Sequence, residues 1–255
     1  MSYLDTLFDL TGKVIVITGG SRGLGREMAF GCAQAGADIV IASRNLENCQ
    51  SVADEVTALT GRQTMAYGLH VGRWDQHEPF TDAVYERFGK VDCLINNAGM
   101  SPIYDRNSEV SEAMFDSVMN LNFKGPYRLT ALMGERMYDA GSGSIINVSS
   151  TGSLRPGPTI IPYAGAKAAL NTMTEGFSKA FGPRVRVNTL MAGPFLSDIA
   201  KAWSDEQRSG ANLANVQALG RNGDPVEVVG LAIYLASDAS SYTTSATIRC
   251  DGGLY

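Results

Sequence analysis

The sequence predicts an α/β fold in which a doubly wound, seven-stranded parallel sheet carries helices on both faces. Two observations predict it. Seven short runs rich in β-branched residues alternate with longer helical patterns along the chain. These runs are nearly continuous in apolar character, as expected of strands that helices cover on both sides. We expect the strands at residues 14–18, 38–42, 64–71, 91–96, 144–149, 185–190 and 246–250.

Composition limits the classes of function. The chain has 255 residues, of which 44% are hydrophobic, so residues 1–255 are expected to bury one core as a single domain. A formal net charge of −5 without a basic run argues against nucleic acid and membrane surfaces as partners. No apolar stretch reaches the roughly 18 residues of a membrane span, and the beginning of the chain has no extended apolar region, which favours a cytoplasmic protein. The cysteines and histidines lack metal-ligand spacing, so no metal is expected.

A glycine-rich turn, Thr-Gly-Gly-Ser-Arg-Gly-Leu-Gly over residues 18–25, follows the first predicted strand and opens the next helix. Glycines let the backbone approach a pyrophosphate, and a helix N-terminus attracts its charge. Right-handed crossovers place such loops at the carboxyl ends of the strands. The turn therefore predicts a Rossmann-type dinucleotide site. Its expected cofactor contacts are Gly19, Ser21, Arg22, Gly23, Leu24 and Gly25.

The end of the second predicted strand indicates which dinucleotide binds. NAD sites of this kind usually place an acid there, but this chain has Ser43, Arg44 and Asn45. No carboxylate stands at these positions to repel a phosphate, and the guanidiniums of Arg22 and Arg44 are suited to a ribose 2′-phosphate. NADP(H) is therefore favoured over NAD(H). The alternative is that both arginines are only solvated side chains.

Tyr163 and Lys167 suggest the chemistry. They stand four residues apart in Tyr-Ala-Gly-Ala-Lys, a helix-favouring stretch, so both side chains project from one helix face. Ser150 precedes Tyr163 by thirteen residues. Reduction of a carbonyl by hydride places negative charge on its oxygen, which then needs hydrogen-bond donors and a proton. A hydroxyl pair can supply both, and the Lys167 cation is expected to lower the phenol pKa from about 10.

Together these motifs resemble the short-chain dehydrogenase/reductase family over essentially the whole chain. The resemblance implies a tetrad of Asn122, Ser150, Tyr163 and Lys167. In it the serine binds the substrate carbonyl, the tyrosine is the acid, the lysine also contacts the nicotinamide ribose, and the asparagine holds a water that relays protons. The resemblance further implies a homotetramer and a cofactor wall that includes Asn97, Ala98 and Gly99.

The chain departs from the family pattern at two places. His70-Val71 follows the third predicted strand where family members commonly carry Asp-Val, and the expected adenine contact passes to these residues. Gly193 and Pro194 follow the sixth predicted strand, and Ser197 stands where a threonine usually reaches the nicotinamide. Each of these five residues is an expected cofactor contact.

Residues 195–222 are expected to form a substrate lid. An apolar stripe with helical spacing would cover a moderately apolar carbonyl compound or, equally, pack on the protein's own core. The stripe consists of Phe195, Leu196, Ile199, Ala200 and Trp203. Arg155, Arg208 and Arg221 offer a different possibility, an anionic substrate such as an acyl-carrier thioester or a sugar acid.

The expected function is reversible, NADPH-dependent reduction of a small carbonyl compound, of ketone or 3-oxoacyl type, to a secondary alcohol. An NAD(H)-dependent dehydrogenase of a sugar acid, steroid or other alcohol is the nearest alternative. A nucleotide-binding sensor without turnover is a third possibility. The four intact tetrad residues argue against it, because a sensor has no need of that constellation.

Overall fold

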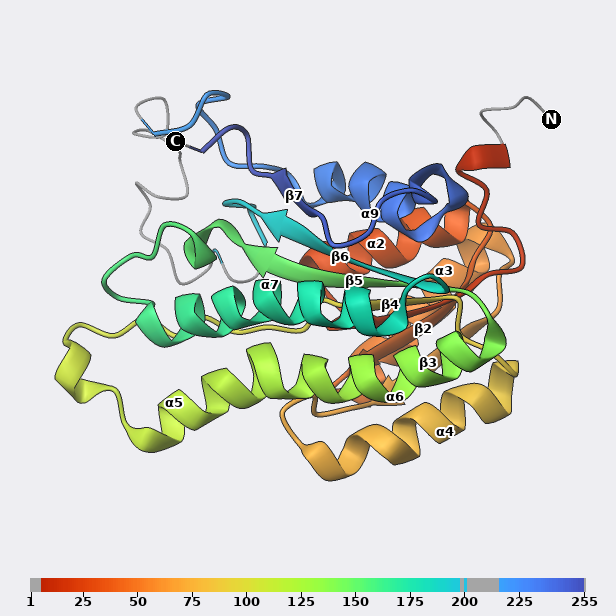
Figure 1. Ribbon diagram of the computed structural model, residues 1–255, viewed down its shortest axis with the longest axis horizontal. Coiled ribbons are helices and arrows are strands. Elements are labelled where there is room, and N and C mark those ends of the chain that lie inside the picture. The colour runs from red at the N-terminus through yellow and green to blue at the C-terminus, as the bar shows by residue number, and fades with distance from the viewer. Residues whose placement is uncertain (1–5, 198–199, 201–215, 255) are drawn as a thin grey trace.

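The protein contains a seven-stranded parallel sheet with the strand order β3-β2-β1-β4-β5-β6-β7 (Figure 1). The computed structural model describes residues 6–197, 200 and 216–254. From β1 the chain winds outward to β3, then returns to the other side of β1 and winds outward again from β4 to β7. The reversal between β1 and β4 opens a crevice at the carboxyl ends of the strands. The predicted doubly wound, Rossmann-type sheet is confirmed.

All seven predicted strands are present, with small differences at their ends. Their bounds are Val14–Thr18 (β1), Asp38–Ser43 (β2), Thr64–Gly68 (β3), Cys93–Asn96 (β4), Gly143–Ser150 (β5), Val185–Ala192 (β6) and Thr247–Cys250 (β7). The expected third strand was too long. The strand ends at Gly68, and beyond it the N–H of His70 donates to the Gln76 side chain at 2.8 Å.

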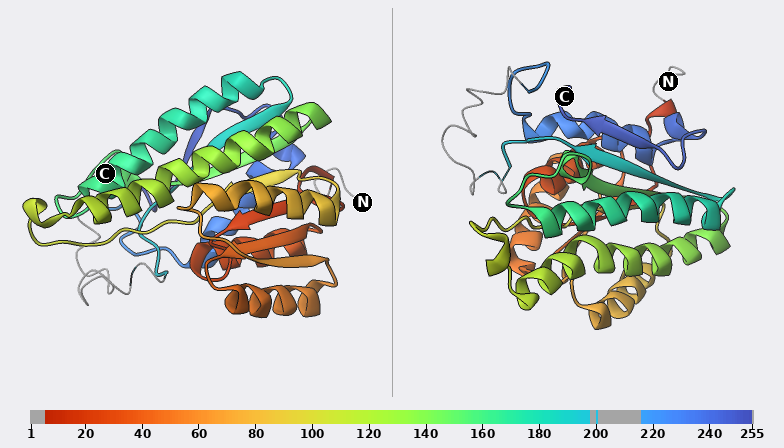
Figure 2. Two further views of the ribbon diagram at one scale, coloured as in Figure 1. Left: turned by 90° about the horizontal axis from the view of Figure 1, so that it is seen from below. Right: turned by 60° about the vertical axis from the view of Figure 1, so that its left-hand side comes forward.

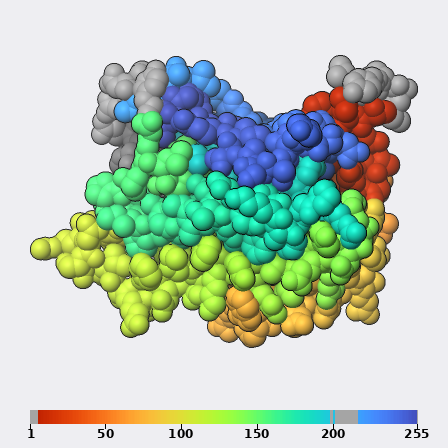
Figure 3. Space-filling view, in the orientation of Figure 1, coloured from red at the N-terminus to blue at the C-terminus, as the bar shows by residue number. Residues whose placement is uncertain are grey.

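Helices cover both faces of the sheet (Figure 2). The helices α2, α3 and α9 lie on one face, at Gly23–Gln34, Leu46–Thr60 and Val229–Ala236. On the other face lie α4, α6 and α7, at His77–Phe88, Gly125–Ala140 and Ile161–Phe181. Helix α5, Glu112–Met119, joins α6 through a π-helical segment, Asn120–Lys124, and α6 and α7 run side by side across the front of the molecule (Figures 1 and 3).

The core is divided by the sheet into two clusters. Successive residues of β1 point to opposite faces, so Ile15 and Ile17 pack under α2 and α9, whereas Val14 and Val16 pack under α4 and α6. This two-sided burial explains why the strands read as unbroken apolar runs. It also fixes the register of the sheet, and with it the positions of the strand ends that face the crevice.

Two glycines test this packing. A methyl group at Gly125 would overlap the carbonyl oxygen of Val71, whereas one at Gly176, an exposed position in α7, would meet nothing within 4 Å. We expect Gly125→Ala to lower the free energy of unfolding by about 2 kcal/mol. Gly176→Ala should raise it by up to about 1 kcal/mol, since alanine favours the helix. Urea unfolding followed by circular dichroism measures both, and equal effects of the two changes would contradict the packing described.

Candidate active site

A cavity of about 900 Å³ opens at the carboxyl ends of the strands. Its wall combines the turn after β1, the ends of β2, β4 and β5, the first half of α7 and the loop after β6. Of the residues expected from the sequence, the cavity is lined by Gly19, Ser21, Arg22, Gly23, Leu24, Ser43, Arg44, Asn45, Val71, Asn97, Ala98, Gly99, Ser150, Tyr163, Lys167, Gly193, Pro194 and Ser197. Three expected residues, Gly25, His70 and Asn122, do not line it.

The turn after β1 is clamped to the end of β4. The side-chain amide of Asn97 donates to the carbonyl oxygens of Thr18 at 2.9 Å and Gly19 at 3.2 Å. Gly19 has a φ of +66°, and a Cβ there would lie 2.9 Å from the Cα of Ala98. Gly25 is buried, and its missing side chain lets α2 approach the carbonyl of Gly19. Only glycine fits either contact.

Helix α2 presents an open N-terminus to the cavity. Its N-cap residue, Arg22, makes no side-chain capping hydrogen bond, and its first turn holds no acidic residue. The N–H groups at the start of a helix need acceptors, and the helix dipole favours negative charge there. The turn and the helix start therefore fit a pyrophosphate.

The part of the cavity beside the end of β2 is polar, and no acid is among the described residues there. The hydroxyls of Ser21 and Ser43 lie 2.9 Å apart, and Asn45 caps α3 by accepting from the N–H of Asn48 at 2.9 Å. Arg22 and Arg44 are exposed and line the cavity. No aspartate or glutamate is among the described residues that line it.

His70 does not line the cavity, contrary to the expected adenine contact. Its imidazole Nδ1 accepts a hydrogen bond from the N–H of Gly72 at 3.2 Å, so the ring is held against its own loop. The neighbouring side chains of Leu69 and Val71 form the wall instead.

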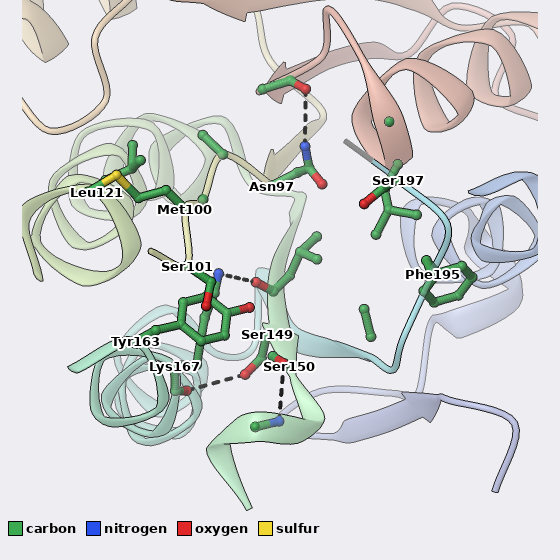
Figure 4. Close-up of a pocket in the computed structure, with 18 of the residues that line it drawn as sticks. Asn97, Met100, Ser101, Leu121, Ser149, Ser150, Tyr163, Lys167, Phe195 and Ser197 are labelled. Carbon is green, nitrogen blue, oxygen red and sulfur yellow. Dashed lines mark hydrogen bonds between the residues drawn. The ribbon is translucent and has the colours of Figure 1, made fainter. Parts of the chain in front are cut away.

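Tyr163 and Lys167 project from α7 toward the end of β5, where Ser149 and Ser150 lie (Figure 4). Lys167 is 3% exposed, and its ammonium donates to the carbonyl of Val148 at 2.7 Å. In return, the Ser149 hydroxyl donates to the backbone carbonyl of Lys167 at 3.2 Å. The sequence spacing thus brings the serine, tyrosine and lysine to one wall.

The protonation of this cluster differs from the sequence expectation. Burial raises the pKa of Tyr163, and the only opposing influence is the hydrogen bond from Ser150. Burial also lowers the pKa of Lys167 to about 8. The expected lowering of the phenol pKa by Lys167 is therefore not seen. The lysine Nζ lies 5.8 Å from the centre of the tyrosine ring and is directed to the Val148 carbonyl.

Asn122 is fully buried in the π-helical segment. Its Nδ2 donates to the carbonyls of Met100 at 2.9 Å and Val118 at 3.0 Å, and its Oδ1 accepts from the N–H of Met100 at 3.3 Å. Both amide hydrogens are thus used within the protein. The side chain cross-links the helix to the segment after β4, and a π-helical turn of this kind is common beside functional sites.

A chain of hydrogen bonds that the sequence did not reveal supports Ser150 from behind. The Asn171 amide donates to the Ser153 hydroxyl at 2.9 Å, and that hydroxyl donates to the carbonyl of Ser150 at 2.7 Å. The Ser150 Oγ accepts from the N–H of Gly152 at 3.1 Å. Asn171 follows Lys167 by four residues, so the spacing of Tyr163 and Lys167, continued one turn further along α7, could have found it.

Other wall residues were also missed. Met100, Ser101, Thr151 and Gly152 directly follow strand-end motifs and could have been found by their position. Ile103, Leu121 and Ile160 come from a loop, the π-helical segment and the start of α7, and only the tertiary fold brings them to the cavity.

Part of the expected lid can be placed. Phe195 lines the cavity and also packs within the core cluster, and Ala200 is buried. Ile199, Trp203 and Arg208 lie outside the described residues. Of the other two candidate anion-binding arginines, Arg221 donates to both carboxylate oxygens of Glu227 at 2.7 Å, whereas Arg155 lines the cavity.

The described ranges contain no group of three or more His, Cys, Asp and Glu side chains that could hold a metal ion. Within the same ranges, no helix has the length and apolar character needed to cross a membrane.

The shifted pKa of Lys167 predicts a pH effect on stability. Its pKa is about 8 in the folded protein and 10.5 without burial, so between these values the unfolded chain binds more protons. The free energy of unfolding should therefore rise with pH from 8 to 10.5, by an amount on the order of 3 kcal/mol. Below pH 8 Lys167 is protonated in both the folded and the unfolded protein, so burial of the ammonium lowers the free energy of unfolding by an amount that does not change with pH.

Lys167→Met should lose this rise, so its stability relative to the wild-type protein is expected to fall as the pH increases through that range. Urea unfolding of both proteins at several pH values measures the difference. Lys179→Met, which removes an exposed ammonium from the same helix, is the control. A difference between the wild-type protein and Lys167→Met that does not change with pH would contradict the prediction.

Comparisons with known proteins agree with this geometry. The family model for short chain dehydrogenases matches residues 13–208. A 3-oxoacyl-acyl-carrier-protein reductase of Thermotoga maritima is 34% identical over 249 residues, covering 96% of this chain and 98% of the relative. A 2-dehydro-3-deoxy-D-gluconate 5-dehydrogenase of Pseudoalteromonas atlantica is 35% identical over 249 residues, covering 96% of this chain and 97% of the relative.

Among solved structures, a gluconate 5-dehydrogenase from Burkholderia cenocepacia in complex with NADP and tartrate superposes with a TM-score of 0.93. It is 31% identical, and the match covers 99% of this chain and 98% of that one. The matched family model and the full-length relatives lead to one conclusion: the chain belongs to the short-chain dehydrogenase family of oxidoreductases.

Proposed function

We propose that the chain is an NADPH-dependent oxidoreductase that reversibly reduces a ketone or 3-oxoacyl carbonyl to a secondary alcohol. One observation carries the proposal: Ser150, Tyr163 and Lys167 share one wall of a cavity whose other end is a glycine turn and an open helix N-terminus. Nucleotide binding alone does not require a hydroxyl pair and a buried lysine at that wall.

The residues present fit NADP(H). The turn at Gly19 and the start of α2 would hold the pyrophosphate, and Arg22, Ser43 and Arg44 would hold the ribose 2′-phosphate. Gly193, Pro194 and Ser197 line the part of the wall after β6, where the carboxamide of the nicotinamide is expected. When bound, the cofactor supplies or accepts the hydride. The relative from Burkholderia cenocepacia was solved with NADP, which supports the choice.

The protein's own groups would manage the charge and the proton. Ser150 and Tyr163 would donate hydrogen bonds to the carbonyl oxygen, and Tyr163 would deliver the proton as charge develops there. Because burial raises the pKa of Tyr163, the phenol is held protonated, as an acid in the reductive direction must be. Lys167 has a pKa of about 8, so at neutral pH its side chain is protonated in most of the molecules. The ammonium would stabilise the tyrosinate that remains after the proton is delivered.

Asn122 is proposed to act through position. Its cross-link between the helix and Met100 would keep the π-helical segment in place beside Lys167. The proton that Tyr163 delivers would then be replaced from solvent past Lys167 and this segment. A single domain over residues 1–255, a homotetramer and a cytoplasmic location stay predictions of the sequence and of the family resemblance.

The proposal is tested by NADPH oxidation with a panel of a 3-oxoacyl thioester, small ketones and diketones. Tyr163→Phe should bind NADPH as the wild-type protein does but lose more than nine-tenths of the turnover, because the ring is retained and only the acid is removed. Retention of more than about a tenth of the rate would refute Tyr163 as the acid. Preference for the thioester would assign the enzyme to acyl metabolism, and preference for small ketones to general carbonyl reduction.

A second prediction concerns the cofactor. Arg44→Ala should weaken NADPH binding about ten-fold and leave NADH binding nearly unchanged, since only NADPH offers a 2′-phosphate to the guanidinium. Fluorescence titration measures both dissociation constants. Arg87→Ala, on α4 and away from the cavity, is the matched control. Wild-type protein that binds NADH at least as tightly as NADPH would overturn the choice of cofactor.

A sugar-acid dehydrogenase is the second candidate. The described cavity wall has no acidic residue and carries three arginines, Arg22, Arg44 and Arg155, in a chain whose net charge is −5. Two of the relatives compared above are named as dehydrogenases of sugar acids. Turnover of a sugar acid in preference to neutral ketones would select this candidate.

A further inference from the structure

A second, smaller cavity adjoins the first at the end of β5. It has a volume of about 310 Å³ and is lined by Thr151, Leu154, Arg155, Arg249 and Leu254. Thr151, Arg155 and Leu254 line both cavities, so the two spaces share a wall. The shared wall begins at Thr151, the residue after Ser150, and thus lies beside the cluster proposed to hold the reacting carbonyl.

Arg155 is fixed on this wall by its backbone. Its N–H donates to the carbonyl of Thr151 at 3.0 Å, which holds its backbone against the short turn Thr151–Ser153 that follows β5. The turn is itself held by the hydrogen bond from Ser153 to Ser150. The turn and the residues after it therefore place both the Ser150 hydroxyl and Arg155, an exposed residue, on the wall of the cavity.

The two arginines that line the smaller cavity, Arg155 and Arg249, differ in whether an acidic side chain neutralises their charge. Arg249 donates from its Nε to the carboxylate of Asp251 at 2.7 Å and also donates to the carbonyl of Leu254. Arg155 pairs with no acidic side chain in the described part of the chain, and none of the described residues lining either cavity is acidic. Its positive charge is therefore the one left for a ligand at this wall.

Arg155 does not belong to the 2′-phosphate end of the cavity. In the sheet, β2 and β5 are separated by β1 and β4. Neighbouring strands are about 4.8 Å apart, so the ends of β2 and β5 are separated by roughly 14 Å. Arg22 and Arg44 line the cavity at the β2 side, whereas Arg155 lines it at the β5 side and is therefore placed to serve another group.

We propose that Arg155 binds a carboxylate of the substrate, beyond the reacting carbonyl and in the smaller cavity. A guanidinium pairs with a carboxylate through two parallel hydrogen bonds, which fixes the orientation as well as the charge. The small volume suits a short acid, and the chain's net charge of −5 opposes docking of an acidic carrier protein. The enzyme thus acts on oxo acids and the corresponding hydroxy acids, an inference that rests on the proposed carbonyl reduction.

The test compares acetoacetate and levulinate with their methyl esters, which lack the negative charge and are larger by one methyl group. Arg155→Gln should lower kcat/KM for the acids at least about ten-fold and change the values for the esters less than about two-fold. Arg155→Lys should fall between, because it keeps the charge and loses the paired hydrogen bonds. Arg221→Gln, an arginine outside both cavities, is the control and should change neither. An equal loss for acids and esters, or no loss for the acids, would overturn the proposal.

A binding measurement separates this proposal from the proposed function. Calorimetric titration of tartrate and levulinate into wild-type protein in the presence of NADP should give heat that Arg155→Gln loses, with thermal melting showing that the variant is folded. Binding that depends on Arg155 without reduction of any carbonyl would support the carboxylate subsite and refute the reductase. Reduction of the esters with acid binding that is unchanged in Arg155→Gln would do the reverse.

Discussion

The site depends on the interlock between β5 and α7. The Lys167 ammonium donates to the Val148 carbonyl, and the Ser149 hydroxyl donates to the Lys167 carbonyl, so the helix and the strand end hold each other in both directions. A buried ammonium is tolerated only where its hydrogen bonds are made, which leaves α7 little freedom to slide or rotate. The interlock therefore sets the position of Tyr163 relative to Ser150, on which every step of the proposed reduction relies.

The wall of the cavity differs in charge from the chain as a whole. The chain is acidic overall, yet the described wall offers arginines, a lysine, hydroxyls and a helix N-terminus, and no carboxylate. Such a wall attracts anions at each end: the phosphates of a dinucleotide beside β1 and β2, and the proposed carboxylate beyond β5. The reacting carbonyl would lie between these two anchors, where the half-buried hydroxyls of Ser150 and Tyr163 meet the buried Lys167.

Much of this follows from the sequence, because short-range patterns determine it. Continuous apolar runs between helical patterns predicted all seven strands, and the glycine turn and the spacing of Tyr163 and Lys167 predicted which loops meet. The buried amide of Asn122 and the second cavity beside Arg155 could not be predicted, because they depend on contacts between distant segments. The ring of His70 turned to Gly72 is a local contact, but it depends on the conformation of a loop that has no periodic pattern. The predicted lowering of the Tyr163 pKa was wrong, because burial raises it. Sequence spacing indicates which groups are near each other but not how deeply they are buried.

The central claim is that this cavity transfers hydride to a carbonyl carbon. The most direct test supplies NADPH deuterated at C4 of the nicotinamide, on each face in turn, together with levulinate and small ketones, and analyses the alcohol product by mass spectrometry. Hydride transfer in this cavity would place one deuterium on the carbinol carbon from one of the two labelled cofactors. A protein that binds the labelled cofactor tightly and yields no labelled alcohol from any substrate would contradict it.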